Sequence, residues 1–484
     1  MTLYALILAL ALTRAAGRPA DSIVHRAIDA IGGEDRWRAV KTLELIGRGA
    51  QYHIGDSEWF DGPYFIDYQT VDDWRDVAQT RRAVRVTTYQ VPSDTGSFTS
   101  TMVLTDTLAN VLEPEHVLWT ALHAPDLHRE RDTVFRFVSH QVVAFHVGKS
   151  PVRLFFESET GMLRMVEVRR TYPNSVFWNA WGDVTERIRY SDWSVEPTGI
   201  WYPQQIDTDR NGRAEETVSY GLVRVNATPD PKLFEPPAAS ATCGFGCQSA
   251  DSVPLGVGGA GGVGPTSPGR GPREIAPGIV QIVGAWNSTL VRQGDGVVVI
   301  EAPISAGYSR KVIQEAGRRF PGAPIKGVIT TTDFWWHVAG LREYVARGIP
   351  IYVLDRNVRV VTERAKAPHT FAPDSLARAP RAPVIRAVST RMALGSGENR
   401  IELIPFHTEQ LDRMMMVYLP ERHLVYTAEG VQLYPSGLTF PQTAFEVVGA
   451  VKREGLAPDT FIGMHVAATP WARLVSVLDS LAHQ

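Results

Sequence analysis

The sequence predicts a chain of two globular parts, an antiparallel β region followed by a region in which strands alternate with helices. Three observations support this prediction. Strand-like stretches follow one another up to about residue 226, a segment rich in Gly, Pro, Ser and Ala fills 238–277, and apolar strands alternate with helical stretches from Gly278 onward. The chain has 484 residues, of which 44% are hydrophobic and 21% charged, so it can bury two ordinary cores.

The N-terminus has the features of an export signal. An apolar run from Leu3 to Leu12 precedes the small residues Ala15, Ala16 and Gly17, which suit a cleavage zone. No Lys or Arg precedes the run, and about ten residues are too few to span a bilayer. We expect residues 1–20 to be a cleaved signal peptide and the mature protein to be periplasmic or secreted, with no transmembrane span. A membrane-retained anchor is the alternative.

The charge balance argues against one class of partner. The chain carries 49 basic and 52 acidic residues, a formal charge of −3. Proteins that bind nucleic acid or anionic membranes through their overall charge carry an excess of Lys and Arg, which is absent here. We therefore expect no nucleic-acid partner.

Residues 21–237 are predicted to form a mostly antiparallel β domain with few helices. A short amphipathic helix over Asp21 to Ile31 ends at Gly32, and a second helix over Pro114 to Ala124 begins with a proline that suits the first turn. The predicted strands mix β-branched and aromatic residues with polar ones. They cover Leu43 to His53, Arg82 to Gln90, Thr133 to Val147, Val152 to Glu157, Leu163 to Thr171 and Thr217 to Asn226. Strands in succession favour a curved sheet or open barrel.

This layout, closed by the segment Leu233 to Pro237, resembles the periplasmic lipoprotein-carrier half-barrels. The resemblance implies an apolar concave surface suited to a lipid-like ligand or a partner. An accessory domain whose concavity only packs on its neighbour is the alternative. His116 and His123 lie seven residues apart near the second helix, and solvated surface histidines are the simpler interpretation of this pair.

The segment 238–277 is predicted to be a linker, and it holds both cysteines. The run from Gly256 to Gly262 cannot bury enough surface to order itself. Cys243 and Cys247 are separated by three residues, two of them glycines that permit a tight loop, so the pair could form a local disulfide in an oxidising compartment. No second pair of Cys or His lies nearby, which argues against zinc at these cysteines.

Residues 278–484 are predicted to form an αββα sandwich, because buried strands alternate with amphipathic helices. The strands cover Ile279 to Val283, Val297 to Ile300, Ile325 to Thr330, Ile351 to Leu354, Ile401 to Ile404, Met415 to Leu419 and Leu424 to Tyr426. The helices cover Ser305 to Phe320, His337 to Arg347, Asn357 to Lys366, Pro441 to Arg453 and Pro470 to His483.

The order of several short blocks in this region resembles the metallo-β-lactamase superfamily. The blocks are Asn287-Ser288, Glu301-Ala302-Pro303, the strand Val328 to Thr330 leading to His337-Val338-Ala339-Gly340, Thr427-Ala428-Glu429 and Gly463-Met464-His465. The last two resemble the strand end that carries an acidic bridging ligand and the final histidine loop. The resemblance implies hydrolytic chemistry with one or two bound zinc ions.

The first metal motif of that superfamily, His-x-His-x-Asp-His, is largely lost. When its last histidine is aligned on His337, the other three ligand positions hold Thr332, Phe334 and Trp336. Phenylalanine and tryptophan cannot coordinate zinc, and their bulk would fill the space that a metal and its water need.

Three ligand-type residues remain at three separate family positions: His337, Glu429 and His465. The family's middle histidine falls near Gln410, and a shift of register would bring in His407 instead. Three protein ligands plus a water molecule form the usual catalytic zinc site, so the remaining set predicts a mononuclear Zn(2+) centre.

Two function classes stay open. As an enzyme, the protein would be a metal-dependent hydrolase of an ester, amide, thioester or phosphoester, with Asp333 as a further ligand or general base. As a pseudoenzyme without metal, it would bind an apolar ligand or partner in a cleft lined by Phe334, Trp335 and Trp336. The sequence identifies neither the substrate nor the oligomeric state.

Overall fold

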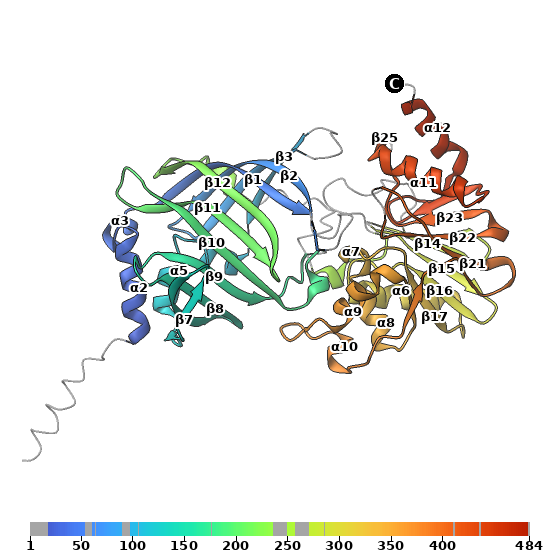
Figure 1. Cartoon of the computed structure of the whole chain (residues 1–484), viewed down its shortest axis with the longest axis horizontal. Coiled ribbons are helices and arrows are strands. Elements are labelled where there is room, and N and C mark those ends of the chain that lie inside the picture. Colours follow the sequence, from blue (N-terminus) through green and yellow to red (C-terminus); the bar gives the residue numbers. More distant parts are fainter. Residues whose placement is uncertain are drawn as a thin grey trace, which may run out of the picture.

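The computed structural model describes residues 18–53, 61–62, 64–89, 97–104, 106–175, 177–235, 249–256, 271–284, 286–409, 412–434 and 437–482. The predicted disulfide between Cys243 and Cys247, the cleavage zone of the predicted signal peptide and Gln410 lie outside these residues. The described strands form one large curved sheet, which we call the N-terminal sheet, and two stacked sheets with helices, which we call the C-terminal sandwich (Figure 1).

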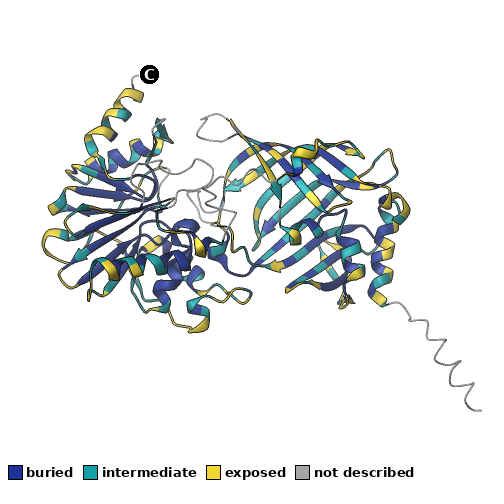
Figure 2. Ribbon diagram, turned by 180° about the vertical axis from the view of Figure 1, so that it is seen from behind, coloured by how far each residue is buried: buried dark blue, intermediate teal, exposed yellow. Residues whose placement is uncertain are grey.

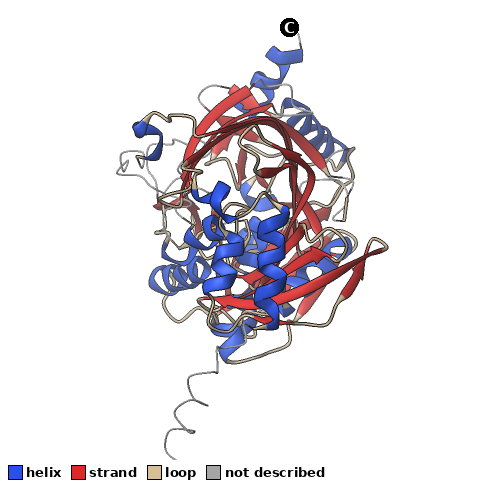
Figure 3. Ribbon diagram, turned by 90° about the vertical axis from the view of Figure 1, so that its left-hand side faces the viewer, coloured by secondary structure: helices blue, strands red, loops and turns tan. Residues whose placement is uncertain are grey.

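The N-terminal sheet has twelve strands, and all its pairs are antiparallel. The order is β4-β3-β2-β1-β12-β11-β10-β9-β8-β7-β5, with β6 paired to β7, and the sheet curves strongly (Figure 3). The strands are β1 (Thr42–His53), β2 (Phe65–Asp76), β3 (Arg81–Tyr89), β4 (Ser97–Leu104), β5 (His128–Arg129), β6 (Thr133–Phe135), β7 (Val138–Val147), β8 (Ser150–Glu157), β9 (Leu163–Arg170), β10 (Val184–Val195), β11 (Trp201–Arg210) and β12 (Arg213–Val225).

Short helices pack against this sheet. They are α2 (Pro19–Ala30), α3 (Glu34–Arg38), α4 (Thr107–Val111) and α5 (Val117–His123), with 3-10 turns η1 (Asn179–Trp181) and η2 (Pro231–Phe234). In α2 the apolar face formed by Val24, Ala27 and Ile28 is buried in the same core as Leu43 and Leu45 of β1. Among the described residues, no helix is both long and apolar enough to cross a bilayer.

A buried ionic cluster lies between the sheet and the segment before α5. Arg75, 2% exposed, contacts Asp73 at 2.9 Å, Glu113 at 2.7 Å and Glu115 at 3.0 Å. Tyr202 donates a hydrogen bond to Glu115. Buried charges need charged or hydrogen-bonding partners, and the members of this cluster supply them to one another.

The C-terminal sandwich contains two mixed sheets. The seven-stranded sheet runs β13 (Gly271–Ala276), β14 (Ile279–Val283), β15 (Ser288–Gln293), β16 (Gly296–Ile300), β17 (Ile325–Thr330), β18 (Ile351–Leu354) and β19 (Ile385–Val388). The six-stranded sheet runs β20 (Met392–Leu394), β21 (Ile401–Pro405), β22 (Met415–Leu419), β23 (Leu424–Thr427), β26 (Thr460–Gly463) and β27 (Thr469–Pro470). A separate hairpin joins β24 (Gln432–Tyr434) to β25 (Gly437–Thr439).

The two sheets pack face to face, and helices cover their outer faces. Ile300 and Ile329 of the larger sheet share a core with Val417 and Tyr426 of the smaller one. This burial on both faces makes the central strands almost wholly apolar, unlike those of the N-terminal sheet (Figure 2). The helices are α6 (Ala306–Arg319), α7 (Trp335–Val338), α8 (Leu341–Ala346), α9 (Val358–Lys366), α10 (Ser375–Arg378), α11 (Pro441–Arg453) and α12 (Trp471–Ala482), with 3-10 turns η4 (Asp355–Asn357), η5 (Gly397–Asn399) and η6 (Pro420–Arg422).

Part of the segment predicted as a linker is structured. Residues 271–276 form the edge strand β13, which pairs with β14. Earlier in the segment, η3 (Ala250–Ser252) docks on α6, where Asp251 accepts a hydrogen bond from the backbone of Gly307 at 2.9 Å and Val253 is buried. Composition alone misses these contacts, because a single apolar side chain and one carboxylate are enough to fix a short segment on an existing helix.

Candidate metal centre

Three side chains that are far apart in the sequence converge at one edge of the C-terminal sandwich. Nε2 of His337 lies 2.8 Å from Oε1 of Glu429, and Nε2 of His465 lies 3.0 Å from the same oxygen. One ligand atom of each residue lies within 4.8 Å of the others, and all three residues are buried. The structure thus brings together three of the four metal ligands predicted from the sequence.

The positions of these residues follow from the strand order. Glu429 and His465 each come two residues after the ends of the neighbouring parallel strands β23 and β26, so both side chains reach the same edge of the sheet. His337 lies in α7, beyond β17 of the other sheet. Asn287 fixes the final loop, because its side chain donates to the carbonyl of Gly463 at 2.9 Å.

Burial and charge have opposite effects on the Glu429 carboxyl. Desolvation raises its pKa, but the two imidazoles of His465 and His337 outweigh this effect and hold the pKa below its ordinary range. Burial lowers the pKa of His337, partly offset by Glu429. The Glu429 carboxyl is therefore held as a carboxylate, which is the form that can bind a metal.

The residues fit a single metal ion. Nδ1 of His337 has no hydrogen bond within the part of the chain that the structure describes, and Nε2 has only its 2.8 Å contact with Glu429, although the ring is fully buried. A metal ion between the three side chains would take the place of the direct contacts between them. Zinc ligands at about 2.0 Å in a tetrahedron lie about 3.3 Å apart, so the two close contacts would have to open by about 0.3–0.5 Å.

Glu301, directly after the apolar strand β16, adds a second buried carboxyl near the centre. It is fully buried and has a φ of 68°, and its Oε1 accepts hydrogen bonds from the Thr331 backbone at 2.9 Å and the Thr331 hydroxyl at 2.5 Å. Burial raises the pKa of Glu301 to about 8, and Glu429 contributes in the same direction. The family resemblance gives Glu301 no role, although an acidic residue at the end of an apolar strand is a usable signal.

The other two predicted site residues lie outside this group. His407 is exposed and pairs with Asp412 at 2.6 Å. Asp333 is buried, and its Oδ2 accepts a hydrogen bond from Arg413 at 3.0 Å, while burial raises the pKa of Asp333 to about 6. Asp333 therefore holds the loop before α7 in place through Arg413.

Trp335, between the two lost ligand positions that hold Phe334 and Trp336, packs against the N-terminal part of the chain. The Trp335 ring lies 4.8 Å from Trp178 and 5.1 Å from Trp181, both on the connection between β9 and β10. Phe334, Trp335 and Trp336 belong to the same buried cluster. The pseudoenzyme alternative has all three lining a cleft, whereas the structure places Trp335 in a core shared by the two halves of the molecule.

Trp336 faces a different set of neighbours. Its ring lies 5.7 Å from His337 and 5.2 Å from Phe177, and Phe177 lies 6.2 Å from Trp286. Phe177 remains 45% exposed. An aromatic side chain from the N-terminal part of the chain thus packs on Trp336, the ring next to His337, which the sequence pattern alone could not show.

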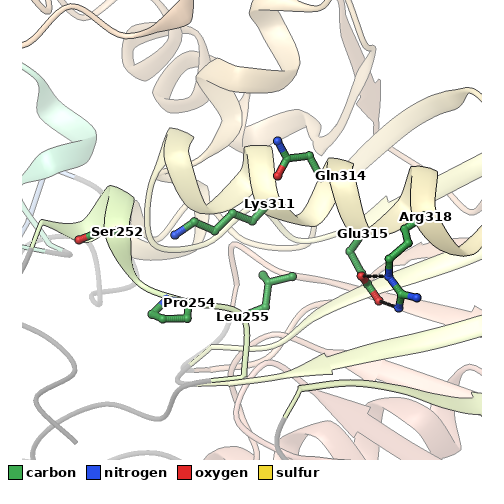
Figure 4. A pocket seen from close by; sticks show the side chains of 7 residues that line it. All are labelled: Ser252, Pro254, Leu255, Lys311, Gln314, Glu315 and Arg318. Atoms are coloured by element: carbon green, nitrogen blue, oxygen red, sulfur yellow. Dashed lines mark hydrogen bonds and ion pairs between the residues drawn. The ribbon is translucent and has the colours of Figure 1, made fainter.

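A separate surface depression lies on the outer side of α6, and none of His337, Glu429 and His465 lines it. It has a volume of about 410 Å³ (Figure 4). Ser252, Pro254, Leu255, Lys311, Gln314, Glu315 and Arg318 line it. No residue of the candidate metal centre contributes to this depression.

No protein-family model and no curated protein sequence matches the chain. Solved structures similar to it include the stereoselective inverting sec-alkylsulfatase Pisa1 from Pseudomonas sp. (17% identity, TM-score 0.32, 43% of this chain and 40% of that chain). They also include a metallo-β-lactamase from Pontibacter korlensis (13%, 0.34, 44% and 99%) and the metallo-β-lactamase DIM-1 (16%, 0.34, 44% and 99%). The chain spans only two-fifths of the alkylsulfatase. These similarities to metallo-β-lactamase-fold structures assign no activity to this chain.

Proposed function

We propose that this protein is a metal-dependent hydrolase that uses one metal ion, held by His337, Glu429 and His465. The observation that supports this proposal is the convergence of the three buried side chains, with both histidines in contact with the same carboxylate oxygen of Glu429. Two imidazoles and one carboxylate are a donor set that zinc accepts in hydrolytic enzymes. When bound, a zinc ion in such a site lowers the pKa of a coordinated water towards neutrality.

The residues around the centre would orient the three ligands. Gln432 donates a hydrogen bond to Oε2 of Glu429 at 3.1 Å, which leaves Oε1 facing the two histidines. Thr427 donates to the Glu429 carbonyl at 2.9 Å and fixes the turn that carries the carboxylate. Partners of this kind hold a ligand in one rotamer, and their loss commonly weakens metal binding by about 10–100-fold.

The alternative is a pseudoenzyme that binds an apolar ligand or partner without chemistry. The contacts of Trp336 with Phe177 and His337 favour it, because the space of the lost metal ligands is filled by aromatic rings. A site closed in this way has room for one metal ion at most.

In either case we propose that the protein is exported, because its N-terminus carries an apolar run followed by small residues.

Elemental analysis of the purified full-length protein tests the proposal. We expect about one zinc, iron or manganese ion per chain, lost in His465→Ala and in Glu429→Ala, which each remove one of three ligands. His407→Ala is the matched control, because this exposed histidine lies outside the group, and its metal content should match the wild type.

Hydrolytic activity should depend on the bound metal ion. Hydrolysis of a panel of chromogenic esters, thioesters, amides and phosphoesters is expected in the metal-loaded wild type and absent in His465→Ala. A wild-type protein that binds no metal after exposure to zinc would exclude the hydrolase and leave the pseudoenzyme. Full metal content in both ligand variants would place any metal elsewhere.

A further inference from the structure

The hairpin that joins β6 and β7 has an unusual tip. Phe135 pairs with Val138, so only Arg136 and Phe137 form the turn. Both have positive φ angles, 50° for Arg136 and 66° for Phe137. Two consecutive central residues with positive φ define a type I′ turn, the tightest connection between antiparallel strands.

The residue types at this turn are unfavourable for its backbone conformation. Type I′ turns strongly favour Asn-Gly, because side chains beyond Asn and Gly are strained at positive φ. An arginine followed by a phenylalanine at these positions costs stability. Since Gly would serve folding better, the presence of Phe137 points to a use for its ring outside the fold.

The tip exposes apolar side chains to solvent. Phe137 is 102% exposed, Val134 is 70% exposed and Val138 is 40% exposed. The three lie within five consecutive residues at the protruding end of a hairpin. A fully exposed phenylalanine that contacts no core is uncommon in a protein that acts alone in solution.

Two arginines accompany these side chains. Arg136 and Arg131 are exposed, and within the described part of the chain neither forms an ion pair. The nearby acidic residues are already engaged, since Asp132 pairs with Arg129 and Glu130 with Arg153. The tip therefore combines three exposed apolar side chains with two exposed arginines, of which Arg136 lies over the Phe135 ring at 5.4 Å.

We propose that the β6–β7 hairpin is a membrane contact, in which Phe137 and its apolar neighbours enter the interface of an anionic lipid surface and Arg131 and Arg136 meet the head groups. A stable protein interface buries about 800 Å² on each partner, far more than a two-residue turn offers. A bilayer requires no matching surface, and a few apolar side chains flanked by arginines suffice for a reversible contact.

The location of the hairpin agrees with this role. Strand β7 lies at the end of the N-terminal sheet that is distant from the C-terminal sandwich (Figure 1). The candidate metal centre therefore stays clear of a surface that the hairpin touches. The overall charge of −3 gives no general attraction to anionic lipid, so binding would depend on this local feature.

Cosedimentation with lipid vesicles tests the proposal. We expect the full chain to bind vesicles of phosphatidylcholine mixed with phosphatidylglycerol and to bind pure phosphatidylcholine vesicles more weakly. The double variant Arg136→Asn/Phe137→Gly supplies the preferred type I′ pair, so it should keep or raise the melting temperature while its vesicle affinity falls by about tenfold or more.

Tyr68→Ser is the matched control, because this aromatic side chain is 56% exposed on β2, away from the hairpin. Its vesicle binding should equal that of the wild type. Equal binding by the wild type and the double variant, or no binding to anionic vesicles, would overturn the proposal. A dimer in sedimentation velocity that the double variant abolishes would instead assign the tip to a second copy of the chain.

Discussion

Asp183 in the N-terminal half of the molecule is tied to Thr370 in the C-terminal half through both carboxylate oxygens. Oδ1 accepts a hydrogen bond from the Thr370 backbone at 2.9 Å, and Oδ2 accepts one from its hydroxyl at 2.6 Å. The Asp183 backbone in turn donates to the carbonyl of Pro368 at 2.8 Å. Together with the ring contacts of Trp335, these bonds fix the N-terminal sheet on the C-terminal sandwich.

Asp183→Ala is expected to loosen this junction. The substitution leaves the Thr370 backbone and hydroxyl donors without their partner, which should cost about 2–4 kcal/mol of the unfolding free energy. Differential scanning calorimetry should show a lower melting temperature or a transition split in two. Asp29→Ala, on the exposed face of α2, is the control and should change the unfolding free energy by less than about 0.5 kcal/mol.

Because of His369, next to Thr370, the free energy of unfolding should decrease as the pH falls. Burial, with a smaller contribution from Arg342, lowers its pKa to about 4 from an ordinary 6.5. Above pH 6.5 the ring is neutral in both folded and unfolded chains. As the pH falls from 6.5 to 4, only the unfolded chain takes up the proton, so up to about 3 kcal/mol of stability is lost.

Urea unfolding at several pH values measures this effect. His369→Gln cannot titrate, so its unfolding free energy should fall less steeply between pH 6.5 and 4 than that of the wild type. Parallel curves for the two proteins would show that His369 titrates normally in the folded chain.

Arg75 offers a test of the ionic cluster inside the N-terminal sheet. Arg75→Met keeps much of the side-chain length but removes the cation next to Asp73, Glu113 and Glu115. Arg82 still pairs with Asp73 and Glu113, whereas Glu115 loses its arginine partner. Breaking a buried ion network in this way should destabilise the protein by about 3–5 kcal/mol, measured by urea unfolding at neutral pH. Arg131→Met, at an exposed position, should leave the unfolding free energy unchanged, and a similar loss in both variants would contradict the interpretation.

The sequence predicted local features well and distant contacts poorly. Apolar runs such as Ile279 to Val283 and Met415 to Leu419 match strands β14 and β22, because burial on both faces leaves a strong signal. The predicted helix over His337 to Arg347 is broken, since α7 ends at Val338 and α8 begins at Leu341. Gly340 lies in this break and packs closely on α6, where a Cβ atom would lie 2.0 Å from the Ser309 hydroxyl oxygen.

The same division holds for the candidate site. Family resemblance identified His337, Glu429 and His465, which the structure brings together. The resemblance could not predict the hydrogen bond from Arg413 to Asp333, because that pair joins segments eighty residues apart. Nor could it show that Trp335 meets Trp178 and Trp181, since contacts between separate sheets leave no periodic pattern in the sequence.

Substitutions of Trp335 distinguish a role in the core from a role in ligand binding. As part of the junction core it is 5% exposed, so Trp335→Ala should cost about 3–5 kcal/mol through the cavity it leaves. Its indole N–H has no hydrogen bond among the described residues, so Trp335→Phe removes only volume and should cost less than about 1.5 kcal/mol. Urea unfolding measures both. If Trp335 instead lined an open cleft, as the pseudoenzyme alternative has it, Trp335→Ala would leave stability nearly unchanged and alter only the binding of an apolar ligand.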